Sequence, residues 1–144
     1  MVDATGAPVG SLLDAYNGFV LRQVGTDRLM LQVTAAGVMP ASISFLHTSP
    51  DCTGIRYVNN QNGSGLTWYA QAVGSQLVYT RLVDPTFTVA VQPRAIEMMA
   101  PNQDLMLPGR CIPLPESTPP QSMGEAVIAV DGGLASLVPP LHVE

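Results

Sequence analysis

Residues 18–33 read GFVLRQVGTDRLMLQV, in which two apolar runs flank a short loop, GTD, at 25–27. In the second run, Leu29, Leu31 and Val33 occupy every second position, which is the period of a strand with one buried face. A glycine-containing loop of this length between two such runs is typical of a β-hairpin. The stretch therefore predicts an antiparallel pair of strands over 18–24 and 28–33.

The same texture recurs on both sides of this hairpin. Short apolar runs broken by Gly, Pro, Asn or Asp return about every 8–12 residues up to about residue 92. The further strands expected from these runs lie at 38–48, 55–59, 66–73, 76–83 and 86–92. Pro40 should lie near the start of its strand or at a sheet edge, because proline has no N–H to donate. The Gly-Ser pair at 74–75 predicts a second, two-residue hairpin.

Helical signals are scarcer. The segment SLLDAY at 11–16 predicts one or two helical turns capped by Ser11. The segment RAIEMMA at 94–100 predicts two more turns that end at Pro101, although its apolar residues also alternate as in a strand. Six prolines between 101 and 120 exclude a helix or a central strand there.

These patterns together predict one mostly-β domain, an antiparallel sandwich or barrel-like fold with short helical turns. Residues 1–100 are expected to form the β-rich core, and residues 101–122 a Pro-rich extended segment. Residues 123–144 are expected to hold a final strand at 125–133 and an apolar tail. Because an exposed apolar tail favours association, we expect it to pack on the same domain or on a partner.

Composition excludes several classes of function. The 144 residues carry a net charge of −5 and no lysine, and the six arginines are scattered singly. Nucleic acids and anionic membrane surfaces require clustered cations, so neither is an expected partner. The absence of lysine also excludes Schiff-base chemistry and the phosphate-loop lysine. No apolar run approaches the roughly 20 residues of a membrane-spanning helix, and no signal peptide is visible.

The two cysteines, Cys52 and Cys111, allow three interpretations. They could form a disulfide that ties the turn around 51–54 to the Pro-rich segment, which would stabilise the fold by roughly 4 kcal/mol. They could both be free and buried, or one could join His47 and His142 around zinc. Zinc ligands usually come in close pairs, which this chain lacks, so we expect no metal and no cofactor. We predict the disulfide, provided that the protein is extracellular.

His47 is the first residue of the stretch HTSPDCTGIRYVN at 47–59 and is the best candidate for a catalytic residue. A general base needs a nucleophile and an orienting carboxylate, and Ser49 and Asp51 are close to it in sequence. However, the chain contains no Gly-x-Ser-x-Gly nucleophile elbow. We therefore interpret 47–59 as a disulfide-linked turn between strands, and we predict no catalytic residue.

Four segments occur in an order that is also found in a known family. They are the opening VDATGAPVG, the hairpin at 20–33, Asp51-Cys52-Thr53-Gly54 and the later GRCIP. Over about residues 2–112 the chain resembles small β-rich domains at the ends of bacterial and phage tail fibres and of collagen-like surface proteins. The resemblance implies a non-enzymatic module that lies outside the cell, on a cell surface or on a virion. It also implies that the module caps a fibre, holds its chains together as a trimer or attaches the fibre tip to a cell surface. No collagen-like Gly-x-y run is present.

Three functions follow as hypotheses. The first is a structural and attachment module that forms a homo-oligomer, a trimer being favoured, and that joins a fibre shaft or a surface glycan. The second is a carbohydrate-binding module that uses exposed aromatic residues, namely Trp68, Tyr69 and Tyr79. Because Trp68 and Tyr69 are neighbours on a strand, at most one of the two need be exposed. The third and weakest is a small hydrolase that uses His47 with Asp51 or Ser49.

Overall fold

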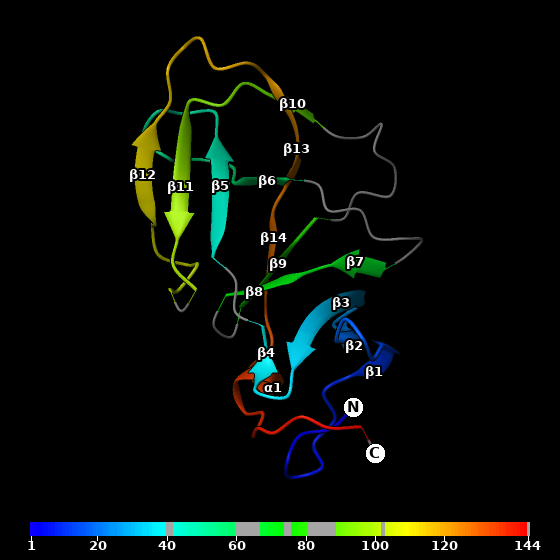
Figure 1. The fold of residues 1–144 in the computed structure, drawn as a ribbon. Coiled ribbons are helices and arrows are strands. Elements are labelled where there is room, and N and C mark those ends of the chain that lie inside the picture. The colour runs from blue at the N-terminus through cyan, green and yellow to red at the C-terminus, as the bar shows by residue number, and fades with distance from the viewer. Residues whose placement is uncertain (40–41, 60–66, 74–75, 81–88, 102, 144) are drawn as a thin grey trace.

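The computed structural model describes residues 1–39, 42–59, 67–73, 76–80, 89–101 and 103–143. The fold is mostly β, as predicted, with several antiparallel sheets in a sandwich-like arrangement (Figure 1). One short helix, α1 (Gly132–Ala135), is present among the described residues and is capped by Asp131. It is far too short to span a membrane.

The first sheet contains five strands and includes the predicted hairpin. Its members are β1 (Ser11–Asp14), β2 (Phe19–Val24), β3 (Asp27–Thr34), β4 (Gly37–Val38) and β7 (Thr67–Tyr69). Val24 pairs with Asp27, so the β2–β3 turn contains only two residues. Gly25, at φ 60°, supplies the left-handed backbone that such a turn needs. The hairpin prediction is confirmed.

The second sheet contains six strands in the order β10-β13-β6-β5-β11-β12 and forms the lobe at the top of Figure 1. Its members are β5 (Ile43–His47), β6 (Tyr57–Asn59), β10 (Val89–Val91), β11 (Ala95–Met99), β12 (Arg110–Pro113) and β13 (Gln121–Glu125). All of its pairings are antiparallel.

The third sheet consists of β8 (Gln71–Val73), β9 (Gln76–Tyr79) and β14 (Val127–Val130), in the order β14-β9-β8. Val73 pairs with Gln76, which confirms the pairing expected of the second hairpin. Its turn at 74–75 lies outside the described residues, as do Pro40 and residues 81–88 of the strands expected at 76–83 and 86–92.

The two faces of the third sheet pack against different cores. On β9, Leu77 and Tyr79 belong to the core beside the first sheet, whereas Val78 belongs to the core beside the second. On β14, Ala129 and Ile128 divide between the two cores in the same way. Successive strand side chains point to opposite faces, so a continuous apolar run suits a sheet covered on both sides. The third sheet is therefore the middle layer of the molecule.

The first and last segments of the chain pack together at the end opposite the six-stranded lobe (Figure 1). Val2 and His142 exchange backbone hydrogen bonds, and Leu141 is buried in the core beside the first sheet. The buried Asp3 carboxylate accepts hydrogen bonds from the backbone of Thr5, Ala7 and Val138. Leu141 and the backbone of the apolar tail thus pack on the same chain, whereas Val138 and Val143 stay exposed.

The helix predicted at 11–16 is wrong, and of the two possibilities at 94–100 the strand is the one that forms. Residues 11–14 form β1, which pairs with β2, and residues 95–99 form β11 between β5 and β12. Pairing with neighbouring strands outweighs the weak local preference for helix. Within the Pro-rich segment, β12 lies at the sheet edge, where the missing N–H of Pro113 is tolerated, and β13 begins only after the last proline.

Candidate functional site

Cys52 and Cys111 form the predicted disulfide, with an S–S distance of 2.12 Å. It joins the turn after β5 to the edge strand β12. Within that turn the Ser49 hydroxyl donates to the Thr53 carbonyl, and the Thr53 backbone N–H donates to Asp51 Oδ1. The two side chains that the sequence offered as partners of His47 therefore stabilise the turn itself.

The partner of His47 is Glu97, which the sequence analysis did not single out. Alternation along the paired strands β5 and β11 places both side chains on the same buried face. His47 Nε2 lies 2.9 Å from Glu97 Oε1. Because an ionised carboxylate can only accept, Nε2 carries the proton in this hydrogen bond.

Arg56, just before β6, completes what we call the carboxylate cluster: His47, Arg56 and Glu97. The Arg56 Nε and Nη2 atoms each donate to one Glu97 oxygen at 2.9 Å. The Gly109 backbone N–H adds a fourth hydrogen bond to Glu97 at 2.7 Å. The guanidinium carbon of Arg56 also lies 4.7 Å from the centre of the Phe45 ring, within cation–π range. The Glu97 carboxylate is thus saturated with donors.

Electrostatics in this cluster follow from those contacts. Burial by itself would raise the pKa of Glu97, but the hydrogen bonds from Arg56, Gly109 and His47 outweigh it and lower the pKa to about 2. Glu97 is therefore ionised at neutral pH and is neutralised by Arg56. Such a bidentate pair is the strong form of a charge-assisted hydrogen bond.

A histidine bonded to a carboxylate can in principle act as a general base through its other nitrogen. His47 Nδ1 is buried and has no hydrogen-bond partner in the described part of the chain. An open hollow of about 510 Å³ lies beside the cluster, with Leu105, Met106 and Ile128 among its apolar walls. No described hydroxyl or thiol is hydrogen-bonded to His47, so the hydrogen bonds of the cluster join only His47, Arg56, Glu97 and backbone groups.

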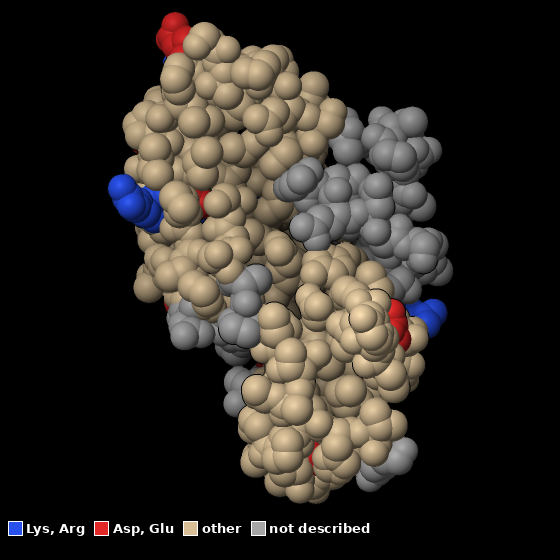
Figure 2. Space-filling view, viewed as in Figure 1, with Lys and Arg blue, Asp and Glu red and all other residues tan. Residues whose placement is uncertain are grey.

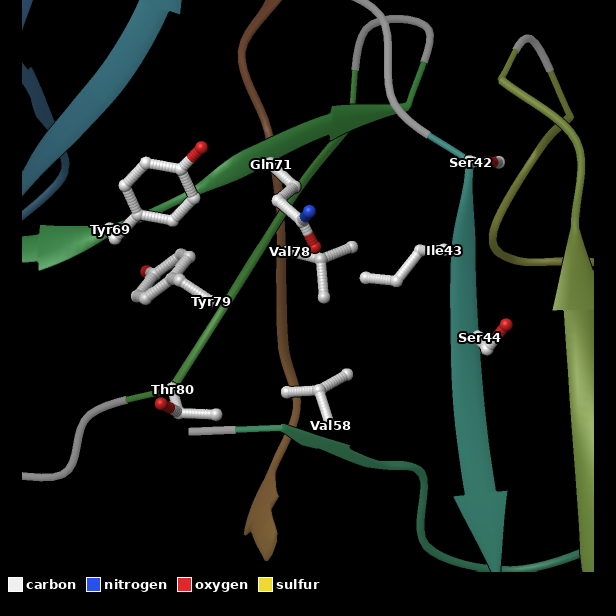
Figure 3. A pocket seen from close by; sticks show the side chains of 9 residues that line it. All are labelled: Ser42, Ile43, Ser44, Val58, Tyr69, Gln71, Val78, Tyr79 and Thr80. Carbon is white, nitrogen blue, oxygen red and sulfur yellow. The ribbon is translucent and has the colours of Figure 1, made fainter. Parts of the chain in front are cut away.

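Two of the three aromatic residues predicted to bind ligand meet in a second hollow, of about 190 Å³, which we call the tyrosine hollow. Tyr69 and Tyr79 lie on one side of it, and Ile43 and Val58 face them from β5 and β6 (Figure 3). The side chain of Trp68 lies outside what the structure describes. The tyrosine hollow is therefore the place where three sheets meet around predicted ligand residues.

Exposure differs between the two tyrosines. Tyr69 is half-buried and makes an edge-to-face contact with Phe19, with ring centres 6.1 Å apart. Tyr79 is only 3% exposed and its hydroxyl donates to Asp27. The expectation that Tyr79 is an exposed aromatic is wrong, because β9 is covered on both faces. Of the two, Tyr69 is the one that is accessible.

Gln71 is a further residue of the tyrosine hollow that the sequence analysis missed. Its side chain extends into the space between the tyrosines and Ile43 (Figure 3). It makes no side-chain hydrogen bond with the described residues and is half-buried. The signal that could have found it is a glutamine inside the apolar run WYAQAV at 68–73.

Within the described residues, no group of His, Cys, Asp and Glu side chains could hold a metal ion.

Comparisons with protein-family models, with curated proteins and with solved structures found no significant match to this chain.

Proposed function

We propose that this chain is a non-catalytic structural and attachment module of a fibre that lies outside the cell or on a virion, and that it self-associates as a trimer. The observation that supports the proposal is that the histidine and the cysteines considered above for chemistry are bonded to other residues of the same chain. His47 is bonded to Glu97, and both cysteines are in one disulfide. The disulfide and the hydrogen bonds of Glu97 both stabilise the fold, which is the role that this proposal assigns to them.

The surface supports a role in contacts between subunits. Charged side chains are few on the face shown in Figure 2, most of which is formed by other residues. Several large apolar side chains are exposed, including Val130 on β14 and Val138 and Val143 in the tail. Sparse charge and exposed apolar groups suit a surface that is covered in an oligomer.

The position of the chain ends fits a fibre tip. The first and last segments pair at one end of the molecule, whereas β12, which carries Cys111 of the disulfide, lies in the opposite lobe (Figure 1). A shaft attached at the paired ends would leave the disulfide-linked lobe pointing outward. The disulfide suits an oxidising location, where such bonds persist.

The solution mass of the intact, unreduced protein tests this proposal. Light scattering should give three times the 15.2 kDa mass of one chain. The trimer should persist on dilution to micromolar concentration. A mass of one chain at every concentration would contradict self-association and remove the physical support for a fibre role.

A second function, carbohydrate binding, is favoured by one specific observation. Tyr69 and Gln71 offer an aromatic ring, a hydroxyl and an amide in the tyrosine hollow, and neither side chain hydrogen-bonds to a described residue. Concave sites with apolar walls and a few polar groups are typical of small-ligand binding. Calorimetric titration with neutral sugars tests this function, and loss of binding in Tyr69→Ala would support it.

A further inference from the structure

The tyrosine hollow has a neighbour. A hollow of about 140 Å³ lies between the β3–β4 region and β8, with Leu31, Val38 and Met39 among its lining. Tyr69 and Gln71 line this hollow as well as the tyrosine hollow. These two residues therefore stand at the boundary of two adjoining spaces.

The chemistry of the lining constrains what could bind. None of the described residues that line either hollow carries a charge. A charged ligand would lose its hydration without gaining a counter-ion, which is costly in a concave, partly apolar site. The Gln71 amide can donate and accept at once, and so can the Tyr69 hydroxyl. That combination matches neutral hydroxyl groups, which also donate and accept.

Size adds a second constraint. Each hollow is smaller than the roughly 300 Å³ at which sites for drug-sized ligands begin. One hollow alone suits a single small ring. The two hollows share Tyr69 and Gln71, so two linked rings could occupy them together while both contact the same amide.

We propose that the two hollows are paired subsites for a neutral oligosaccharide, and that Gln71 hydrogen-bonds to the sugar rings on both sides. This inference rests on the carbohydrate-binding function above and adds the ligand's charge class and minimum length. Tyr69 lines both subsites and offers each of them the apolar surface of its ring and the polar hydroxyl at its tip.

Calorimetric titrations of the full chain test the proposal. The probes are glucose, galactose and N-acetylglucosamine, and the neutral disaccharides maltose, lactose and diacetylchitobiose. At least one disaccharide should bind ten times more tightly than either ring alone, and N-acetylneuraminic acid, which is charged, should not bind. Equal affinity for a ring and its disaccharide would overturn the paired subsites but leave sugar binding standing. If none of the neutral probes binds, both the subsites and the carbohydrate function are rejected.

Two variants separate the role of Gln71 from folding. Gln71→Leu keeps the side-chain size and removes the amide, and it should weaken disaccharide binding at least tenfold. The matched control is Gln121→Leu, an exposed glutamine on β13 that lines neither hollow. Both variants should melt within a few degrees of the parent. If disaccharide binding is unchanged in a folded Gln71→Leu variant, Gln71 does not contact the ligand.

Discussion

His47 and Glu97 lie fifty residues apart in the chain, yet their side chains meet at 2.9 Å on the buried face of the six-stranded sheet. The antiparallel register of β5 and β11 brings them together, and Arg56 supplies the charge that keeps Glu97 ionised there. Removing one partner of a buried ion pair such as Arg56–Glu97 strongly destabilises a fold, because the other charge is left buried without compensation. The cluster therefore offers the most direct tests of how this fold is held together.

Replacing Glu97 by glutamine should lower the free energy of unfolding by about 3 kcal/mol, because it leaves Arg56 without its partner charge. The matched control is Glu116→Gln, since Glu116 pairs with Arg94 but is 86% exposed. That change should cost less than about 1 kcal/mol, as exposed pairs contribute little. Urea unfolding measures both. A Glu97→Gln variant as stable as the control would contradict the role assigned to the cluster.

Stability should fall in acid. The pKa of Glu97 is lowered from 4.5 to about 2 in the folded state, so its contribution is complete above pH 4.5 and is lost as the pH falls towards 2. Hydrogen bonds from the Val138 backbone and the Thr5 side chain also hold the pKa of Asp3 well below its usual range, which acts in the same direction. Unfolding free energies between pH 7 and pH 2 should show this slope. The slope should be shallower in Glu97→Gln, and an unchanged slope would mean that Glu97 does not titrate in this window.

Reduction of the Cys52–Cys111 bond should destabilise the fold by roughly 4 kcal/mol, because the bond closes a long loop in the unfolded chain. Thermal melting with and without reductant measures the loss. The double variant Cys52→Ser, Cys111→Ser should melt at the temperature of the reduced parent, and its melting temperature should not change when reductant is added. Counting two free thiols in the unfolded, unreduced parent would show that the bond does not form.

Leu77 should be the most sensitive residue of the middle sheet, because it is fully buried on β9. Leu77→Ala should lower the free energy of unfolding by about 3 kcal/mol through lost burial and the cavity left behind. Leu107 is 58% exposed, and Leu107→Ala should change stability by about 0.5 kcal/mol or less. Similar losses in both variants would argue against the middle-layer position of β9.

Local patterns were enough to predict the elements whose signals lie within a few residues. The β2–β3 hairpin follows from period-two alternation around Gly25, and the turn chemistry around Asp51 and Thr53 is equally local. The pairing of Cys52 with Cys111 could be predicted because only two cysteines exist. In each case either the interacting residues are close in sequence or few alternatives compete.

Partners chosen across long stretches of chain could not be read from those patterns. Residues 95–99 carry a pattern that fits a helix or a strand, and only the pairing of β11 with β5 and β12 settles the choice. The same pairing brings Glu97 to His47 and Arg56, and no spacing in the sequence encodes that meeting. The sharing of Tyr69 and Gln71 between two hollows likewise depends on how three sheets pack.

The alternating pattern of the chain thus specified that it forms strands and where several of them begin, and the presence of only two cysteines left one possible disulfide. Tertiary structure alone specified which strands are neighbours and that β9 is covered on both faces. It alone also specified which polar side chains meet in the interior of the protein. The physical reason is the range of the interactions. Alternation and turn geometry act over two to four residues, whereas sheet order and buried ion pairs depend on packing the whole chain at once.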